Sequence, residues 1–465
     1  MVARLRPEAV GLGIRSARSV SPLGSDPRLV VISETDDLIA PLCAGLDALG
    51  WRTVTARSAA AAAATVSDFA IEAAIIDVGH SDFPGMARAL RRAAGRRRLA
   101  VVSICGDPEQ ADPDVDLVMS GVPHPTQLAL RAEQLVRAAV AEEEFELRRT
   151  TLSEYGAALD PEPTDPAPLR ILVAGGADPR FLALSNALTA AGAEVVAAPT
   201  PYTAFDYLHE SAFDGAVLWG APDHAPALSI ASGMKRNTRL YHIPLTLYLR
   251  DPGELNLSDL FNRGFADVAA PDTSESETAA RVMALAAAHR RLVSIRKALE
   301  SARGSSLMDP STGLFTKELF AAHLARLAEA AKVRRRPLSV CVLRVSDASD
   351  LAHARAGGWL DRAMPQIGAM VSRLVRVEDT AARLAPEVFA LALPATTGAA
   401  ARLTAERIGA VVGCTAFDAG PDRSPFVVEF DIGSAEVAPG ENPASVLERA
   451  SSDLVTRKAA KPAQS

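Results

Sequence analysis

The chain has 465 residues, of which 48% are hydrophobic and 23% are charged, and its formal net charge is −7. This composition excludes a mostly disordered chain, and at roughly 100–200 residues per domain the length predicts about three domains. The negative charge argues against a DNA-binding protein, because such a protein needs a broad basic surface. The sequence has no run of about 18 apolar residues, so we expect no membrane insertion and a cytoplasmic location.

The first domain is predicted at residues 28–145. Residues 1–27 before it are expected to form a loose tail, since charges stand where a signal peptide would need an apolar stretch. The domain opens with a short apolar strand pattern at 28–33, an amphipathic helix pattern follows, and a further buried strand ends at Asp77.

A second copy of this pattern is predicted at residues 169–290. Arg170 and Trp219 are separated by as many residues in this copy as Arg28 and Asp77 are in the first. Both copies alternate strands with helices, which predicts two flavodoxin-like, doubly wound parallel sheets in an α/β protein.

Two linkers and a third domain complete the predicted organisation. The linker at 146–168 is rich in Pro and Asp, and residues 291–308 are expected to form a linker helix. Residues 309–459 mix helices with a hairpin-like pair of strands, which predicts a palm-like α/β domain, and residues 460–465 form a final tail. The basic run at 332–336 is interpreted as a solvated turn.

The first domain resembles the receiver family. Asp77 ends a buried strand where receivers carry their phospho-accepting Asp, and Glu34 follows the first strand. The resemblance implies phosphorylation of Asp77 and Mg²⁺ binding by Glu34 together with Asp77. The sequence departs from the family at Cys105, where Ser or Thr is expected, and near Gly121, where Lys is expected. The alternative is that Asp77 only ends a strand in a docking module.

The second domain resembles a receiver that has lost this chemistry. Trp219 replaces the acceptor Asp, and Gly175 and Gly176 replace the acidic pair. An indole can neither bind Mg²⁺ nor accept a phosphoryl group. We therefore expect a binding or dimer surface here, and a homodimer of the chain.

The third domain resembles the GGDEF family of diguanylate cyclases over nearly its full length. Four segments carry the resemblance in the family's order, and they read DPSTGLF, RVEDTAARLAPEVFALALP, FDIGSAEV and LERASSDLVTRKAA. Several matches in the right order are far more specific than one motif alone.

The signature loop of this domain departs from the family. It reads Ala385-Pro386-Glu387-Val388-Phe389, so both glycines are replaced and Pro386 removes an N–H donor. Val388 stands at a metal-ligand position, and Arg344 stands where the family has another metal-binding Asp. Cyclisation of GTP needs metal-assisted alignment, so we predict no cyclase activity. The alternative is weak activity supported by Glu387 alone.

A regulatory anion site is predicted just before this loop. Arg376 and Asp379 form an RxxD motif at the spacing of the family's product-inhibition site, and Arg407 lies at the position of its additional arginine. The resemblance implies that cyclic di-GMP binds here, with arginines on phosphate or guanine and Asp379 on the guanine edge. Arg383 lies on the same hairpin and is a further candidate. The alternative is a surface Arg–Asp pair with an unrelated helical Arg.

The order receiver, degenerate receiver, degenerate GGDEF domain resembles a family of cyclic di-GMP effectors of the alphaproteobacterial cell cycle. That resemblance implies a non-enzymatic adaptor that is recruited to a cell pole. It also implies partners of the RcdA, CtrA and ClpXP type, with delivery of CtrA to the protease. Two alternatives remain: a receiver-controlled diguanylate cyclase of the PleD type, and a scaffold that uses no nucleotide.

Overall fold

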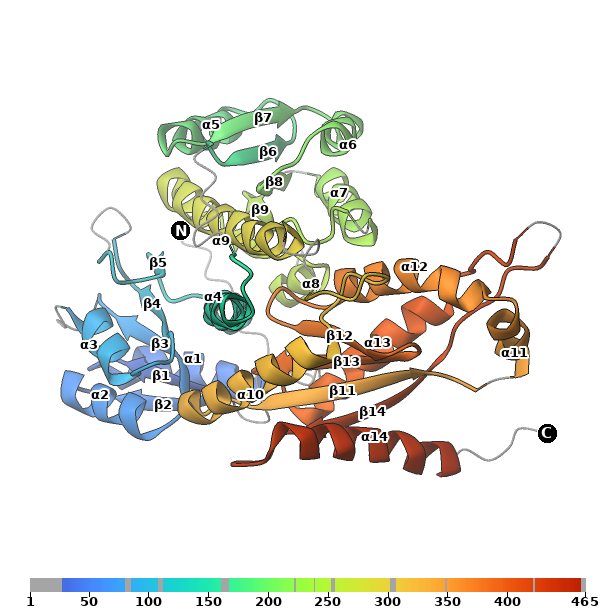
Figure 1. Cartoon of the computed structure of the whole chain (residues 1–465). Coiled ribbons are helices and arrows are strands. Elements are labelled where there is room, and N and C mark those ends of the chain that lie inside the picture. Colours follow the sequence, from blue (N-terminus) through green and yellow to red (C-terminus); the bar gives the residue numbers. More distant parts are fainter. Residues whose placement is uncertain are drawn as a thin grey trace.

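The computed structural model of the chain describes residues 27–79, 85–107, 112–159, 167–220, 223–237, 239–251, 256–301, 307–347, 349–420 and 423–460. Apart from their inner ends at Pro27 and Ala460, the predicted tails lie outside the described residues. The described residues form three β-sheets, each covered by helices (Figure 1). None of the described helices combines the length and the apolar character needed to cross a membrane.

The first unit is a parallel five-stranded sheet with the order β2-β1-β3-β4-β5. Strands β3 and β4 are buried along their whole length, which explains why most of their residues are apolar. Helices α1 and α4 cover one face of the sheet, and α2 and α3 cover the other. Its elements are β1 (Arg28–Ile32), α1 (Asp36–Ala48), β2 (Arg52–Ala56), α2 (Ala59–Asp68), β3 (Ile71–Asp77), α3 (Met86–Ala93), β4 (Ala100–Ile104), β5 (Leu117–Met119) and α4 (Pro125–Glu154).

The second unit repeats this topology, with the strand order β7-β6-β8-β9-β10 and parallel pairing throughout. Helices α5 and α9 pack on one face, and α6, α7 and α8 pack on the other. The predicted α/β architecture with parallel sheets is thus confirmed. The elements are β6 (Arg170–Ala174), α5 (Pro179–Ala190), β7 (Glu194–Ala198), α6 (Pro201–Glu210), β8 (Gly215–Gly220), α7 (Ala225–Arg236), β9 (Leu245–Leu249), α8 (Leu257–Asn262), β10 (Asp267–Ala269) and α9 (Glu275–Ser301).

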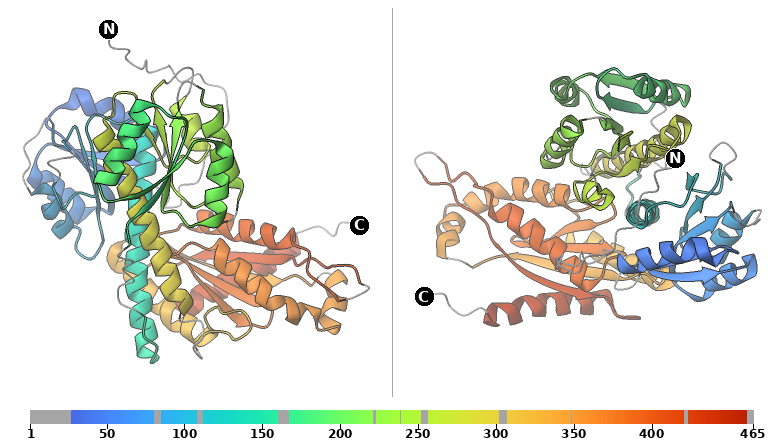
Figure 2. Two further views of the ribbon diagram at one scale, coloured as in Figure 1. Left: turned by 90° about the horizontal axis from the view of Figure 1, so that it is seen from above. Right: turned by 180° about the vertical axis from the view of Figure 1, so that it is seen from behind.

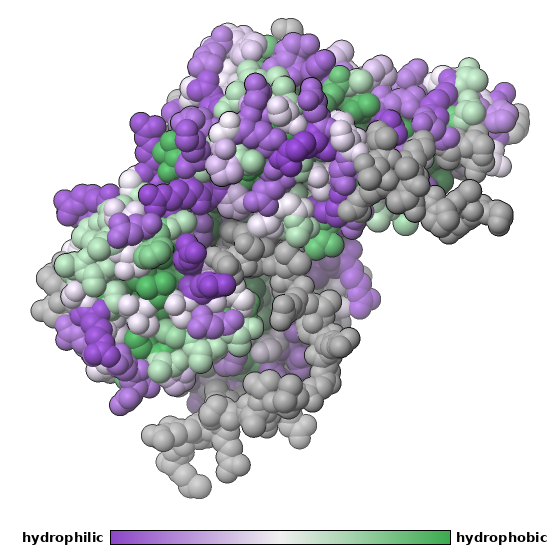
Figure 3. All heavy atoms as spheres, turned by 90° about the horizontal axis from the view of Figure 1, so that it is seen from below, coloured by the Kyte–Doolittle hydropathy of each residue, from purple (hydrophilic) through white to green (hydrophobic). Residues whose placement is uncertain are grey.

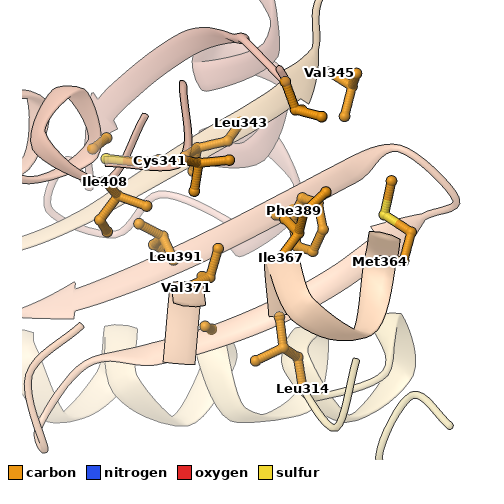
Figure 4. Packing of buried hydrophobic residues seen from close by; sticks show 14 of the residues in the cluster. Leu314, Cys341, Leu343, Val345, Met364, Ile367, Val371, Phe389, Leu391 and Ile408 are labelled. Carbon is orange, nitrogen blue, oxygen red and sulfur yellow. The ribbon is translucent and has the colours of Figure 1, made fainter. Parts of the chain in front are cut away.

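The C-terminal unit is an antiparallel four-stranded sheet with the order β12-β13-β11-β14. Helices α12 and α13 cover one face, where Phe389 and Leu391 of β13 pack against Ile367 of α12 (Figure 4). Helices α10 and α14 cover the other face. The elements are α10 (Lys317–Arg334), β11 (Leu338–Val345), α11 (Ser349–Ala356), α12 (Trp359–Leu374), β12 (Thr380–Ala385), β13 (Val388–Pro394), α13 (Gly398–Gly413), β14 (Phe430–Glu436) and α14 (Pro443–Ala460).

Two long helices connect the N-terminal units to the C-terminal unit. Helix α4 has 30 residues and α9 has 27, and they run side by side past the edge of their own units (Figure 2). Phe145 and Leu152 of α4 and Ile295 of α9 lie in the same apolar cluster as Phe320 of α10. The ends of α4 and α9 are therefore part of the core of the C-terminal unit.

The basic run at 332–336 does not form the solvated turn that we expected from the sequence. The guanidinium of Arg336 is buried and donates hydrogen bonds to Glu72 of β3 (3.0 Å) and to Glu143 of α4 (2.5 Å). Arg335 donates to the backbone oxygens of Ser67 and Asp68. The run thus joins the first unit to the C-terminal unit. Seen from below, hydrophilic and hydrophobic side chains are interspersed over the visible surface of the molecule (Figure 3).

Gly433 of β14 permits the close approach of helix α14. A Cβ atom at this position would lie 1.9 Å from the backbone oxygen of Ala450. We expect Gly433→Ala to lower the free energy of unfolding by about 1–3 kcal/mol, because the helix must move away from the sheet. Urea denaturation measures this change. Gly413→Ala is the control, since its Cβ would meet only the Val428 oxygen at 3.8 Å, and an equal loss in both variants would contradict the explanation.

Candidate functional site

The Arg376–Asp379 segment is a tight turn between helix α12 and strand β12. The helix ends at Leu374, and the Asp379 N–H donates to the Arg376 oxygen (3.2 Å). The Asp379 side chain closes the turn, because its Oδ2 accepts from the Arg376 N–H (2.9 Å). The predicted RxxD motif is therefore a rigid structural unit whose Asp is fixed by its own backbone.

Asp379 is buried and only partly satisfied by hydrogen bonds. It is 4% exposed, and its Oδ1 has no hydrogen-bond partner among the residues that the structure describes. Burial, followed by the charge of Glu378, raises the pKa of Asp379 to about 6. A buried acceptor without a donor is unusual in a folded protein and points to an absent partner.

Four charged groups gather with Asp379 around a small hollow of about 80 Å³. Arg376 comes from the turn itself, Arg148 from α4, and Arg296 and Glu300 from α9. Within the described residues, the Arg376 guanidinium makes no hydrogen bond, and burial lowers its pKa, with the charge of Arg137 adding to the effect. Three guanidinium groups against two carboxylates make this hollow attractive to an anion.

Helix α4 holds the two residues that flank Asp379 in the sequence. Arg137 of α4 donates to Glu378 (2.8 Å), and Glu144 of α4 accepts from the Thr380 hydroxyl (3.2 Å). These α4 residues and Arg148 were not among the residues predicted for the site. The only indication in the sequence was their spacing. Arg137 and Glu144 are seven residues apart and Glu144 and Arg148 are four apart, which places all three on one face of a helix.

A buried polar cluster extends this contact into the C-terminal unit. Glu144 Oε1 lies 2.8 Å from His323 Nε2, and the Arg148 guanidinium donates to it at 2.9 Å. Burial alone would raise the pKa of Glu144, but His323 and Arg148 outweigh it and the pKa is lowered. Glu144 is thus an ionised group that joins α4 to α10 and β12.

The two other predicted ligand residues lie in different surroundings. Arg407 of α13 is exposed, and its Nη2 donates to the Leu374 oxygen (3.3 Å). Its charge helps to lower the pKa of Arg376, so the two guanidinium groups are neighbours. Arg383 instead donates to Asp309 (3.2 Å) and to the Pro386 oxygen (2.7 Å). Arg383 therefore ties the hairpin to the DPSTGLF segment and does not line the hollow.

The signature loop contains charged pairs. Arg355 donates to both carboxylate oxygens of Glu387, at 3.0 and 2.7 Å. Arg344 of β11 lies opposite Asp431 of β14 and contacts it at 3.4 Å. No cluster of three His, Cys, Asp or Glu side chains that could hold a metal occurs in the described residues.

The two acidic residues predicted for the first unit lie in contrasting places. Asp77 is 1% exposed, and its Oδ2 accepts from the Ser33 hydroxyl (2.7 Å). Glu34 is exposed on the loop after β1. No group of three His, Cys, Asp or Glu side chains lies here in the described residues, and the Glu34–Asp77 pair stays a prediction.

The carboxyl edge of the second sheet is aromatic. Trp219 packs against Phe181 and Tyr248, with ring centroids 5.2 and 5.6 Å away. Gly175 makes room for the indole, because a Cβ there would lie 2.3 Å from the Trp219 Cβ. Trp219 thus fills space at the position that the sequence comparison assigned to an acceptor Asp.

We expect Asp379→Asn to raise the free energy of unfolding by about 1–2 kcal/mol at pH 7. The pKa of about 6 lies above the ordinary 3.8, so the fold favours the protonated form. The stability that the protonated Asp379 contributes is fully present below about pH 4. It is lost as the pH rises through 6, because the buried carboxylate then ionises. Urea unfolding at pH 7 and pH 4 measures it. An equal gain at both pH values would contradict the assignment.

Comparison with known proteins assigns residues 306–464 to the family "Diguanylate cyclase, GGDEF domain". Residues 306–464 of the chain thus contain a GGDEF domain. No curated protein matches the chain.

Solved GGDEF domains share similarity with this part of the chain. The FimX GGDEF domain from Pseudomonas aeruginosa is 20% identical, with 33% of this chain and 96% of that chain covered and a TM-score of 0.31. The GGDEF domain of DgcB from Caulobacter crescentus, solved in complex with c-di-GMP, is 23% identical, with 34% and 89% covered and a TM-score of 0.31.

Proposed function

We propose that the chain is a non-enzymatic cyclic di-GMP effector that binds the dinucleotide at the Arg376–Asp379 turn. The observation that carries this proposal is Asp379 Oδ1, a buried acceptor for which the described part of the chain offers no donor. The N1–H and N2–H₂ groups of a guanine edge are donors of the kind that it lacks. Arg376 beside it and Arg407 nearby can bind phosphate or the guanine O6/N7 edge.

The signature loop supports a non-enzymatic role. Glu387 is already paired in a bidentate manner with Arg355, and Arg344 places a cation where the family has a metal ligand. A cation at this position opposes Mg²⁺ binding, and Pro386 stiffens the loop that must approach GTP. We therefore infer that the GGDEF domain is degenerate and does not cyclise GTP.

We further propose that the two N-terminal units are receiver domains. Their sheet order is that of flavodoxin-like folds, which include receivers. Asp77 is the candidate phospho-acceptor. The described residues hold no group of three metal-ligating side chains here, and Glu34 with Asp77 stays a proposed pair of Mg²⁺ ligands.

The order of the three units resembles that of PopA, a cyclic di-GMP effector. On this resemblance we propose a homodimeric adaptor that is recruited to a cell pole. We also propose that it engages partners of the RcdA, CtrA and ClpXP type in regulated proteolysis. These partners rest on the resemblance alone.

Calorimetric titration of the full chain with cyclic di-GMP tests the ligand. We expect saturable binding, and no comparable binding of cyclic di-AMP, because adenine N1 is an acceptor and cannot donate to Asp379. Absence of saturable cyclic di-GMP binding would remove the proposal. A GTP turnover assay with Mg²⁺ tests the second part, and formation of cyclic di-GMP would favour the receiver-controlled cyclase instead.

A further inference from the structure

The dinucleotide site is too small for its ligand in this structure. The hollow at Arg376 and Asp379 measures about 80 Å³. Pockets that enclose a drug-sized ligand measure about 300–1,000 Å³, and a cyclic dinucleotide belongs at the upper end of such ligands. Some part of the surroundings must therefore move before a guanine can reach Asp379.

Helix α4 contacts both sequence neighbours of Asp379. It holds the residue before Asp379 through Arg137 and Glu378, and the residue after it through Glu144 and Thr380. Phe145 of α4 is 1% exposed and belongs to the core cluster of the C-terminal unit. Figure 1 shows α4 end-on between the first unit and the edge strand β12.

The contact between α4 and the turn is incompletely satisfied. Buried side-chain atoms without a hydrogen-bond partner occur on both sides of it, namely Arg137 Nη2, Glu144 Oε2, Arg148 Nη2 and Asp379 Oδ1. Unsatisfied buried polar atoms weaken a packed contact, because each has lost water without gaining a partner. Such a contact can be displaced by a ligand that satisfies the same atoms.

We propose that this structure is a closed state in which helix α4 and cyclic di-GMP compete for the Arg376–Asp379 turn, so that ligand binding releases α4 from the C-terminal unit. This inference rests on the proposed function, since it assumes that cyclic di-GMP is the ligand. In the open arrangement, α4 is detached from the turn and the ligand can bind. Because only a small fraction of the molecules is open without ligand, the apparent affinity for the ligand is lower than the affinity of the open arrangement. Release exposes the α4 face and the edge of β12, which gives the chain two different surfaces to present.

Hydrogen–deuterium exchange on the unmodified full chain tests the release directly. We expect cyclic di-GMP to increase amide exchange in residues 141–154 of α4, because a short helical segment without tertiary contacts is only marginally stable. The segment 376–380 should become protected in the same experiment. Protection of α4 by the ligand would overturn the proposal.

Phe145→Ala tests the competition by affinity without changing any charge. It weakens the contact of α4 with the C-terminal unit, so we expect cyclic di-GMP to bind about tenfold more tightly or better than in the parent chain. Leu128→Ala is the matched control, because Leu128 is on the same helix and fully buried but packs in the core of the first unit. Its affinity should equal that of the parent.

The outcomes separate the two proposals. Saturable binding of equal strength in the parent chain and Phe145→Ala would overturn the competition and leave the effector function standing. Absence of binding in both would overturn the effector function itself. If Phe145→Ala does not fold, the exchange measurement on the parent chain still decides.

Discussion

Arg376→Ala is expected to weaken cyclic di-GMP binding by about 100-fold, because the ligand loses a charge-assisted bidentate contact and Asp379 loses its neighbouring cation. The guanidinium makes no hydrogen bond within the described residues, so its removal breaks no hydrogen bond of the free protein. Because the buried Asp379 carboxylate loses a nearby cation, we expect the free energy of unfolding to fall by about 0.5–1.5 kcal/mol without loss of the fold. Calorimetric titration measures the affinity, and urea unfolding measures the stability.

Arg373→Ala is the matched control for this change. Arg373 is exposed on the last turn of α12, three residues before Arg376, and shares its charge. Its replacement should change affinity by less than about threefold, through the loss of general electrostatic attraction. If Arg373→Ala weakened binding as much as Arg376→Ala does, the contact at Arg376 would be no more than general attraction.

Arg336→Ala is expected to lower the free energy of unfolding by about 3–5 kcal/mol. Its guanidinium is buried and satisfies Glu72 and Glu143, which are also buried. Removal of the cation leaves the buried Glu72 carboxylate without this partner, whereas Glu143 keeps Arg334 at 3.4 Å and the Arg98 N–H at 2.6 Å. Urea or thermal unfolding at pH 7 measures the loss.

Two further sets of variants test the explanation for Arg336→Ala. Lys332→Ala removes an exposed cation from the same basic run and should cost less than about 0.5 kcal/mol. Adding Glu72→Gln and Glu143→Gln to Arg336→Ala should restore part of the stability, because neutral amides are less costly to bury than unpaired carboxylates. A loss below about 1 kcal/mol in Arg336→Ala would show that water relieves the carboxylates.

The fold could be predicted from the sequence more completely than the surroundings of the site. Short runs of buried apolar residues, such as Leu29–Ile32 of β1, indicated parallel sheets, and the order of four motifs indicated the GGDEF domain. Arg376 and Asp379 could be proposed because they lie close together in the chain. The sequence could not predict the other arginines of the site. Arg137 and Arg148 of α4 lie more than a hundred residues before the turn, and Arg296 of α9 lies about eighty residues before it. Only tertiary packing brings them to the turn.

Two expectations about arginines show why local patterns were insufficient. Arg383 was a candidate because it lies on the hairpin, but its guanidinium is directed to Asp309 and the Pro386 oxygen. Arg336 was assigned to a solvated turn because the chain as a whole is acidic. Net charge says nothing about a particular pair of acidic partners, and here Glu72 and Glu143 come from β3 and α4.

The sharing of α4 between two cores has a consequence for synthesis on the ribosome. Phe145 and Leu152 have their final partners in the C-terminal unit, including Leu338 and Leu454. At about 5–20 residues per second, these partners emerge roughly 10–60 s after the helix itself. During that interval the nascent chain carries a bare apolar stripe on an otherwise folded domain. Chaperones that hold exposed hydrophobic segments would bind here. In a fragment that ends after the second unit, α9 would still cover part of the stripe through Arg291 and Ile295, and the part that packs against the C-terminal unit would stay exposed.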